Sequence, residues 1–208
     1  MVEINKEKLD VLYLLTQDLE QVRRYADHDP KYHESTLEHT RSMMAEANSI
    51  LAMKPDLALR PRYLQAIIMA HDLGERGLTC DHSAFAQANK KEASRLKQEH
   101  EDKQFNELGK SHPWILSLRD DFENIQTAEA ALANLLDKMD SLRHIVKNGV
   151  KKLTEEQAKF TMAYHAKAVE RFEDMIENFP QLAGILLFAK SLLNFLKAEY
   201  RANGLSLD

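Results

Sequence analysis

The residues best suited to chemistry in this sequence are the adjacent pair His71 and Asp72. They follow an apolar run, residues 64–70, that has the composition of a buried helix. Two ionisable side chains in such a place cost free energy unless a partner offsets their burial, and a divalent cation is a partner that both can bind. His39 upstream and Asp137 downstream supply the same two ligand types. The order His, His-Asp, Asp along the chain therefore predicts a metal site.

Two imidazoles and two carboxylates suit a hard or borderline divalent ion in an open octahedral site. Four protein ligands leave coordination positions for water and for a substrate oxygen. Water on such an ion becomes a nucleophile near neutral pH, and the ion offsets charge on a phosphoryl group. The ligand set therefore predicts a catalytic ion, for which Mn²⁺, Co²⁺, Fe²⁺, Ni²⁺, Mg²⁺ and Zn²⁺ are all candidates.

Each of the four residues also has a simpler interpretation. His71 could be a hydrogen-bonded core histidine, and Asp72 could cap the turn that follows. Asp137 could form a solvated ion pair with Lys138, and His39 could face water. Taken singly, each residue favours the simpler interpretation, whereas their order and apolar flanks together favour the metal site.

Helix signals explain how these residues could be positioned. Ser35 and Glu38 have the spacing of a capping box, which places His39 in the first turn of a helix. A further helix is expected over residues 63–72 and ends at Gly74. Neighbouring residues on a helix face different ways, so the side chains of the His-Asp pair can converge only because the helix ends there.

Helical periodicity covers most of the remaining chain. The expected helices are one that carries apolar residues over 9–22 and ends near residues 27–30, and those over 84–105, 127–149, 154–179 and 182–202, with a loop over residues 75–83. Six glycines and five prolines leave few turn signals, and no alternating run predicts a sheet. The expected fold is all-α, a helical bundle with the metal site in its core and extra helices at the C-terminus.

Composition limits the class of protein. At 208 residues the chain suits one domain with a substantial core, and a formal net charge of −5 speaks against a nucleic-acid polymer as partner. The single cysteine, Cys80, excludes an internal disulfide and fits a reducing compartment. The N-terminus shows no signal-peptide pattern, and the apolar stretch 182–189 is too short to cross a bilayer. A cytoplasmic chain without a membrane partner is expected.

Several segments resemble the HD-domain metal-dependent phosphohydrolase superfamily, whose signature is His, His-Asp, Asp. The likeness is nearest to its bacterial 5′-deoxynucleotidase-like branch. It is carried by Glu34-Ser35-Thr36-Leu37-Glu38-His39-Thr40, Ala70-His71-Asp72-Leu73-Gly74-Glu75, Leu78-Thr79-Cys80-Asp81 and the helix that runs from Glu129 through Asp137 to Gly149. The resemblance covers about residues 32–149. It implies one HD-type domain over residues 1–208, with helices at 154–203 packing on it or on a partner.

The resemblance also implies residue roles. The metal ligands would be His39, His71, Asp72 and Asp137. Glu75 would position or deprotonate the attacking water, and Asp81 would assist as a second acid/base or contact the leaving group; the simpler interpretations are a solvated glutamate and a turn aspartate. The branch usually has an arginine shortly before the first histidine motif. This chain has Lys31 there, which keeps the charge but lacks the bidentate fork for phosphate.

The implied function is divalent-metal-dependent hydrolysis of a small, nucleotide-like phosphomonoester, as by a 5′-nucleotidase. One ion is expected; His33 and His82 could serve a second ion but are better explained as surface histidines. Two alternatives stay open. One is a non-catalytic metal-containing module for ligand sensing or partner binding, which the exchanged arginine mildly favours. The other is an alarmone or cyclic-nucleotide hydrolase, although alarmone hydrolases usually have Glu-Asp where this chain has Glu75-Arg76.

Two further patterns concern surfaces. Basic residues over 90–97, including Lys97, alternate with glutamates, which is typical of a solvated helix face. The apolar stripe over residues 182–196 is wide enough for a core on one side and a homodimer contact on the other.

Overall fold

The structure is a computed structural model that describes residues 2–26, 33–81, 91–148 and 153–205. These residues form eight α-helices and one antiparallel pair of two-residue strands, which confirms the all-α prediction. The chain divides into two compact units, Met1–Ala133 and Asn134–Asp208, and each is described by itself. The single HD-type domain over residues 1–208 stays a prediction.

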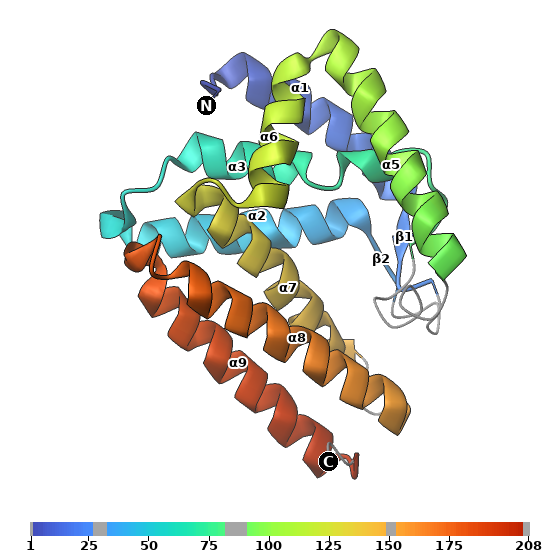
Figure 1. Ribbon diagram of the computed structural model, residues 1–208, viewed down its shortest axis with the longest axis vertical. Coiled ribbons are helices and arrows are strands. Elements are labelled where there is room, and N and C mark those ends of the chain that lie inside the picture. Colours follow the sequence, from blue (N-terminus) through green and yellow to red (C-terminus); the bar gives the residue numbers. More distant parts are fainter. Residues whose placement is uncertain (1, 27–32, 82–90, 149–152, 206–208) are drawn as a thin grey trace. The chain divides into compact units, whose positions relative to one another are not determined.

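The first unit is built mainly of helices (Figure 1). Its α-helices are α1 (Lys6–Thr16), α2 (Thr36–Met53), α3 (Pro61–Ala70), α5 (Lys91–Ser111), α6 (Pro113–Asn124) and the first turns of α7 (Ala128–Asn148). Three 3₁₀ helices, η1 (Gln17–Gln21), η3 (Pro55–Leu57) and η4 (Leu73–Glu75), complete it. Its core is built from fully buried aliphatic side chains: Leu12, Leu19, Met43, Leu64, Ile67, Ile68, Leu73, Ile115 and Leu118.

A short sheet precedes α2, where the sequence predicted none. Strand β1 (Arg23–Arg24) pairs antiparallel with β2 (Glu34–Ser35). The backbone N–H of Asp81 donates to the carbonyl of Arg23 at 2.7 Å, so the loop after η4 is attached to the same strand. Strands of two residues are too short to show alternation, so periodicity could not predict them.

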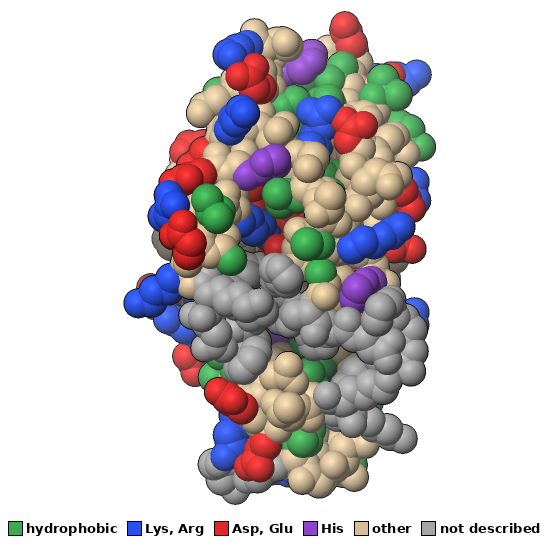
Figure 2. Space-filling view, turned by 90° about the vertical axis from the view of Figure 1, so that its right-hand side faces the viewer, with side chains coloured by type: hydrophobic (Ala, Val, Ile, Leu, Met, Phe, Trp, Pro, Cys, Tyr) green, Lys and Arg blue, Asp and Glu red, His purple; other side chains and the backbone are tan. Residues whose placement is uncertain are grey.

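Helices α5 and α6 depart from the predicted boundaries. α5 was expected over 84–105, whereas the described helix runs from Lys91 to Ser111; residues 82–90 lie outside the described ranges. α6 was not predicted, although Pro113 at its start and the buried Ile115 and Leu118 are consistent helix signals. Figure 2 shows basic and acidic side chains interspersed over the face that carries α5.

The second unit contains most of α7, then α8 (Glu155–Met175), η6 (Pro180–Leu182) and α9 (Ala183–Ala202). The predicted capping box at the start of α8 is present, since the Thr154 side chain accepts from the Gln157 N–H and the Gln157 side chain accepts from the Thr154 N–H. α8 and α9 lie side by side (Figure 1). α9 buries one face against α8 and leaves large apolar side chains exposed on another, namely Leu187, Phe188 and Phe195.

Within the described ranges, one segment, Pro180–Ala202, is long and apolar enough to cross a membrane, and the mean hydropathy of its 18-residue apolar window is 1.2. It meets that criterion by length and composition only, and one third (33%) of its apolar window is buried. Core helices of soluble proteins meet the same criterion.

Candidate metal centre

The start of α2 fixes the position of His39. The Ser35 hydroxyl accepts from the Glu38 N–H at 3.0 Å, and the Glu38 carboxylate accepts from the Ser35 N–H at 2.6 Å. This predicted capping box satisfies N–H groups that otherwise lack partners at a helix start. His39 follows in the first turn, with its side chain fully buried. The interpretation of His39 as a water-facing residue is therefore wrong.

The end of α3 brings the His-Asp pair together. His71 keeps helical backbone angles as the C-cap, whereas Asp72 leaves the helix at φ −103° and ψ 10°. Because of this break, the Nε2 of His71 lies 3.0 Å from the Oδ2 of Asp72. The Nε2 of His39 lies 3.9 Å from the same oxygen. Two adjacent residues and one from another helix thus point at a common position.

These three side chains fit a divalent ion. One donor atom from each, His39, His71 and Asp72, lies within 4.8 Å of the other two. Two ligand atoms at right angles around one ion, each at about 2.1 Å, are about 3.0 Å apart. The carbonyl of Ile68 accepts from the Nδ1–H of His71 at 2.7 Å, which leaves the Nε2 lone pair of that ring available to a metal.

The charge of Asp72 is also suited to a cation. Burial raises its pKa, but the His71 ring, the His39 ring and the Arg24 guanidinium outweigh burial and hold the pKa below its ordinary value. The group is therefore a carboxylate at neutral pH, which is the form that binds metals.

Asp137, the fourth predicted ligand, lies on α7 in the second unit. Its carboxylate accepts from the Lys138 ammonium at 2.7 Å, and the pair is partly buried rather than solvated. Its role as a metal ligand stays a prediction.

Glu75 is a buried carboxylate held at both oxygens. Its Oε2 accepts from the Thr36 hydroxyl at 2.8 Å, and its Oε1 accepts from the Lys97 ammonium at 2.9 Å. Thr36 lies three residues before His39 on α2, and Glu75 lies three residues after Asp72. Burial, with the Asp72 carboxylate second, raises the pKa of Glu75. The simpler interpretation of Glu75 as a solvated glutamate is wrong.

Asp81 and Lys97 complete this acidic cluster. The Lys97 ammonium also donates to the Asp81 carboxylate at 2.8 Å and lies 3.4 Å from the Glu101 carboxylate. Burial lowers the pKa of Lys97, but its three acidic neighbours outweigh burial and raise the pKa above the ordinary value. Burial raises the pKa of Glu101 to about 7. Lys97 is thus a positive charge among three acidic side chains.

The charge pattern over residues 90–97 predicted a solvated face, and for Lys97 that prediction is wrong. A signal was present in the spacing of Lys97, Glu101, Phe105 and Leu108, which share one face of α5 because they are four, four and three residues apart. Phe105 and Leu108 are buried, so Lys97 continues an inward face. Lys97 therefore differs from Arg95 on the same helix, which is exposed and forms ion pairs with Glu92 and Glu99.

Arg24 is a second residue of the centre that the sequence did not predict. Its charge lowers the pKa values of both Asp72 and Glu75, so it acts on the candidate centre from β1. Lys31, the predicted substrate-binding residue, and His82 lie outside the described residues. Lys31 therefore stays a prediction. Arg24 also precedes the first histidine motif in the sequence, and its effect on Asp72 and Glu75 is evident only from the structure.

Comparison with known protein families identifies the family to which this helical fold and His/Asp cluster belong. The HD domain family matches residues 16–179, well over half of the 208 residues, and the chain belongs to this family. HD domains are generally metal-dependent hydrolases, and the match supports divalent-metal binding by the His/Asp cluster. No curated protein and no solved structure matches the chain.

Proposed function

We propose that this chain hydrolyses a small phosphomonoester, nucleotide-like as in a 5′-nucleotidase, at the centre formed by His39, His71 and Asp72. The observation that supports this proposal is that these three donor atoms lie within 4.8 Å of one another. The buried Glu75 lies three residues after Asp72 in the chain. Asp137 is proposed as a further ligand from the second unit. Mn²⁺, Co²⁺, Fe²⁺, Ni²⁺, Mg²⁺ and Zn²⁺ stay candidates.

The ion, when bound, would offset phosphoryl charge and make water more acidic. Glu75 would accept the proton of the attacking water at its carboxylate. A raised pKa brings a carboxylate closer to the operating pH, where a general base is most effective, and burial raises the pKa of Glu75. The Thr36 hydroxyl and the Lys97 ammonium hold this carboxylate in one orientation.

Arg24 is proposed to contact the phosphate of the substrate. A guanidinium presents paired N–H groups that match two phosphoryl oxygens, and Arg24 already acts electrostatically on Asp72 and Glu75. In that role Arg24 would supply the guanidinium that is exchanged at Lys31, which would weaken the argument for a non-catalytic module. Asp81 would assist at the leaving group, as the family resemblance implies.

Phosphate release from a substrate panel tests the proposal. The full-length protein is stripped of metal, reloaded with each divalent ion in turn and incubated with nucleoside 5′-monophosphates, sugar phosphates, alarmones and cyclic nucleotides. We expect phosphate release from a subset of the monoesters. Cleavage of alarmones, which yields pyrophosphate, and of cyclic nucleotides, which yields monophosphates, is followed by chromatography of the products. No cleavage of any compound would rule out the enzyme, and cleavage of alarmones or cyclic nucleotides alone would replace the substrate class.

The Asp72→Ala variant tests whether the activity depends on a metal held at this centre. It removes a charged ligand, so we expect lower metal content by elemental analysis and loss of the activity. Asp10→Ala is the matched control, because Asp10 is an exposed residue of α1. Full metal occupancy and turnover in Asp72→Ala would contradict the assigned centre.

A further inference from the structure

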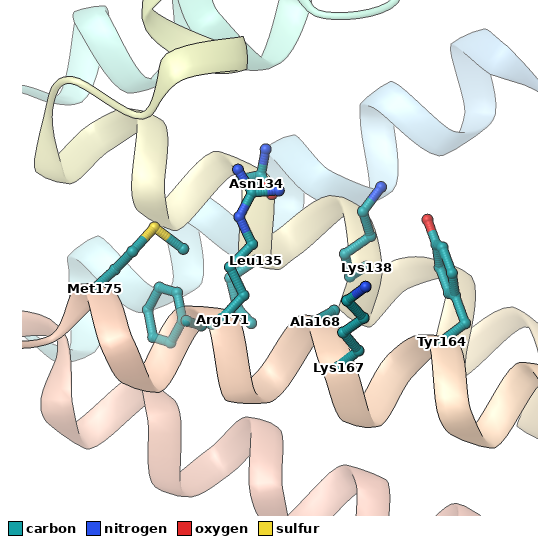
Figure 3. Close-up of a pocket in the computed structure, with 9 residues that line it drawn as sticks. Asn134, Leu135, Lys138, Tyr164, Lys167, Ala168, Arg171 and Met175 are labelled. Atoms are coloured by element: carbon teal, nitrogen blue, oxygen red, sulfur yellow. The ribbon is translucent and has the colours of Figure 1, made fainter.

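The second unit contains a pocket between α7 and α8 that the proposed function does not use (Figure 3). Its volume is about 400 Å³, within the range of about 300–1,000 Å³ that small-molecule sites occupy. Met175 lies at one end of the pocket and Tyr164 at the other, with Lys138, Lys167 and Arg171 between them.

Three of the lining side chains are cations, from both helices. Lys138 on α7 donates to the Asp137 carboxylate at 2.7 Å, so one charge is already offset. Lys167 and Arg171 on α8 form no ion pair with any residue that the structure describes. The pocket therefore retains an excess of positive charge.

The spacing of these two exposed cations places their charges side by side. Lys167 and Arg171 are four residues apart, so they are neighbours on one face of α8, where like charges destabilise a helix. A bound anion would turn that repulsion into attraction for both. The Arg171 guanidinium can donate hydrogen bonds to two oxygens of one phosphate, and the Lys167 ammonium can donate to a third oxygen.

The rest of the lining is apolar. Leu135, Ala168, Phe172 and Met175 offer carbon and sulfur surface beside the cations. An inorganic anion would pair only with the charges of Lys167 and Arg171. A ligand with an organic part would also bury this apolar surface. The combination of an apolar wall and two cations that have no ion-pair partner in the described part of the chain fits a phosphorylated organic molecule.

We propose that the pocket between α7 and α8 is a binding site for a small organic phosphate, with its phosphate on Lys167 and Arg171 and its organic part against Leu135, Phe172 and Met175. All lining residues belong to the second unit, and none is among His39, His71, Asp72 and Asp137. Lys138 contacts Asp137, whereas Lys167 and Arg171, the proposed phosphate contacts, form no ion pair with a proposed metal ligand within the described ranges. Binding is therefore expected in the absence of metal and of catalysis.

Calorimetric titration of the full-length, EDTA-treated protein with AMP, inorganic phosphate and adenosine tests the site. AMP is expected to bind more tightly than phosphate, because only AMP also covers the apolar wall. Adenosine is expected to show no binding, because it lacks the charge. Without binding of AMP and phosphate, or with adenosine as tight as AMP, the proposal is overturned.

Variants locate the binding. In Lys167→Gln/Arg171→Gln the affinity for AMP should fall about tenfold or more, the usual effect of losing hydrogen bonds between charged groups. Lys159→Gln removes a charge from the same helix outside the pocket, and its affinity should match the wild type. Circular dichroism checks that each variant is folded, and the single variant Arg171→Gln gives a milder second test.

The Asp72→Ala variant separates this site from the metal centre. It should bind AMP as the wild type does, even if the proposed hydrolysis proves absent. Loss of AMP binding in Asp72→Ala, together with unchanged binding in the double variant, would assign the anion to the metal centre and contradict the proposal.

Discussion

At the scale of single residues, the candidate centre depends on the Lys97 ammonium, which donates to more than one acidic side chain. Lys97 lies within hydrogen-bonding distance of Glu75 and Asp81, and both acids are largely buried. Buried like charges repel each other strongly where water is excluded. Lys97 therefore makes it possible for Glu75 to remain an oriented carboxylate near Asp72.

Replacing Glu75 should separate proton transfer from metal binding. Glu75→Gln keeps an oxygen for the Thr36 hydroxyl and removes the base. We expect unchanged metal content and a turnover lower by about 10²–10⁴-fold, the usual loss for a positioned acid/base. The matched control is Glu101→Gln, which also neutralises an acid beside Lys97 and should keep most of the activity. Wild-type turnover in Glu75→Gln would refute the role given to Glu75.

Replacing Lys97 should cost stability. Lys97→Met keeps the length of the side chain and leaves Glu75 and Asp81 without their shared counter-charge. Removing one partner of a buried ion pair costs on the order of 3 kcal/mol, to be measured by urea denaturation near neutral pH. Lys91→Met, at an exposed position in the first turn of α5, should change stability by about 0.5 kcal/mol or less. Equal effects for the two variants would show that Lys97 is an ordinary surface lysine.

At the scale of elements, close packing of α5 on η4 sets the geometry of the turn that carries Asp72 and Glu75. A Cβ on Gly74 would lie 2.7 Å from Cε2 of Phe105 and 2.9 Å from Cβ of Glu101. Because Gly74 has no side chain, α5 can approach η4 closely. Lys97, which lies two helical turns before Phe105 on α5, can then reach Glu75.

Alanine at Gly74 should therefore destabilise the protein and disturb the centre. Overpacking of this kind costs about 1–3 kcal/mol, and we expect weaker metal binding because Asp72 and Glu75 flank the residue. Gly184 on α9 is the control, since nothing lies within 4 Å of an added Cβ there. Gly184→Ala should stabilise by about 0.5–1 kcal/mol. Thermal unfolding and metal titration distinguish the two variants, and a neutral Gly74→Ala would contradict the packing argument.

At the scale of the whole molecule, buried ionisable groups limit the pH range of stability. His165 on α8 is buried, and its Nδ1–H donates to the Thr161 carbonyl at 2.8 Å. Burial lowers the pKa of His165 to about 4. The folded state therefore holds this ring neutral at pH values where an unfolded histidine is already protonated.

The sign of the pH dependence follows from that difference. Above an unfolded pKa of about 6.5, both states are neutral and the ring contributes no pH dependence. As the pH falls toward 4, only the unfolded state gains the proton, and stability is lost at about 1.4 kcal/mol per pH unit. Between pH 7.5 and 5 the wild type should thus lose about 2 kcal/mol more than His165→Gln. Urea denaturation of both proteins across this pH range measures the difference in the free energy of unfolding. Parallel pH profiles would show that His165 does not contribute to the pH dependence of stability.

The sequence by itself determined the local features of this protein. The capping boxes at Ser35 and Thr154 and the place of His39 in the first turn of a helix follow from interactions within a few residues, which periodicity and spacing encode. The convergence of His71 and Asp72 at a helix end was predicted for the same reason. The helical class and three of the four proposed ligands could therefore be placed before the fold was known.

Only the tertiary structure decided the surroundings of that centre. Thr36 and Glu75 are 39 residues apart, and Glu75 and Lys97 are 22 residues apart. Such pairs leave no local pattern, because any lysine on a charged helix has the same neighbours in sequence whether it faces water or a buried acid. The pairing of β1 with β2, which joins Arg23 and Arg24 to Ser35 and Glu34, is likewise a contact between separate segments of the chain. Side chains distant in sequence meet only when burial of the apolar core brings their helices together.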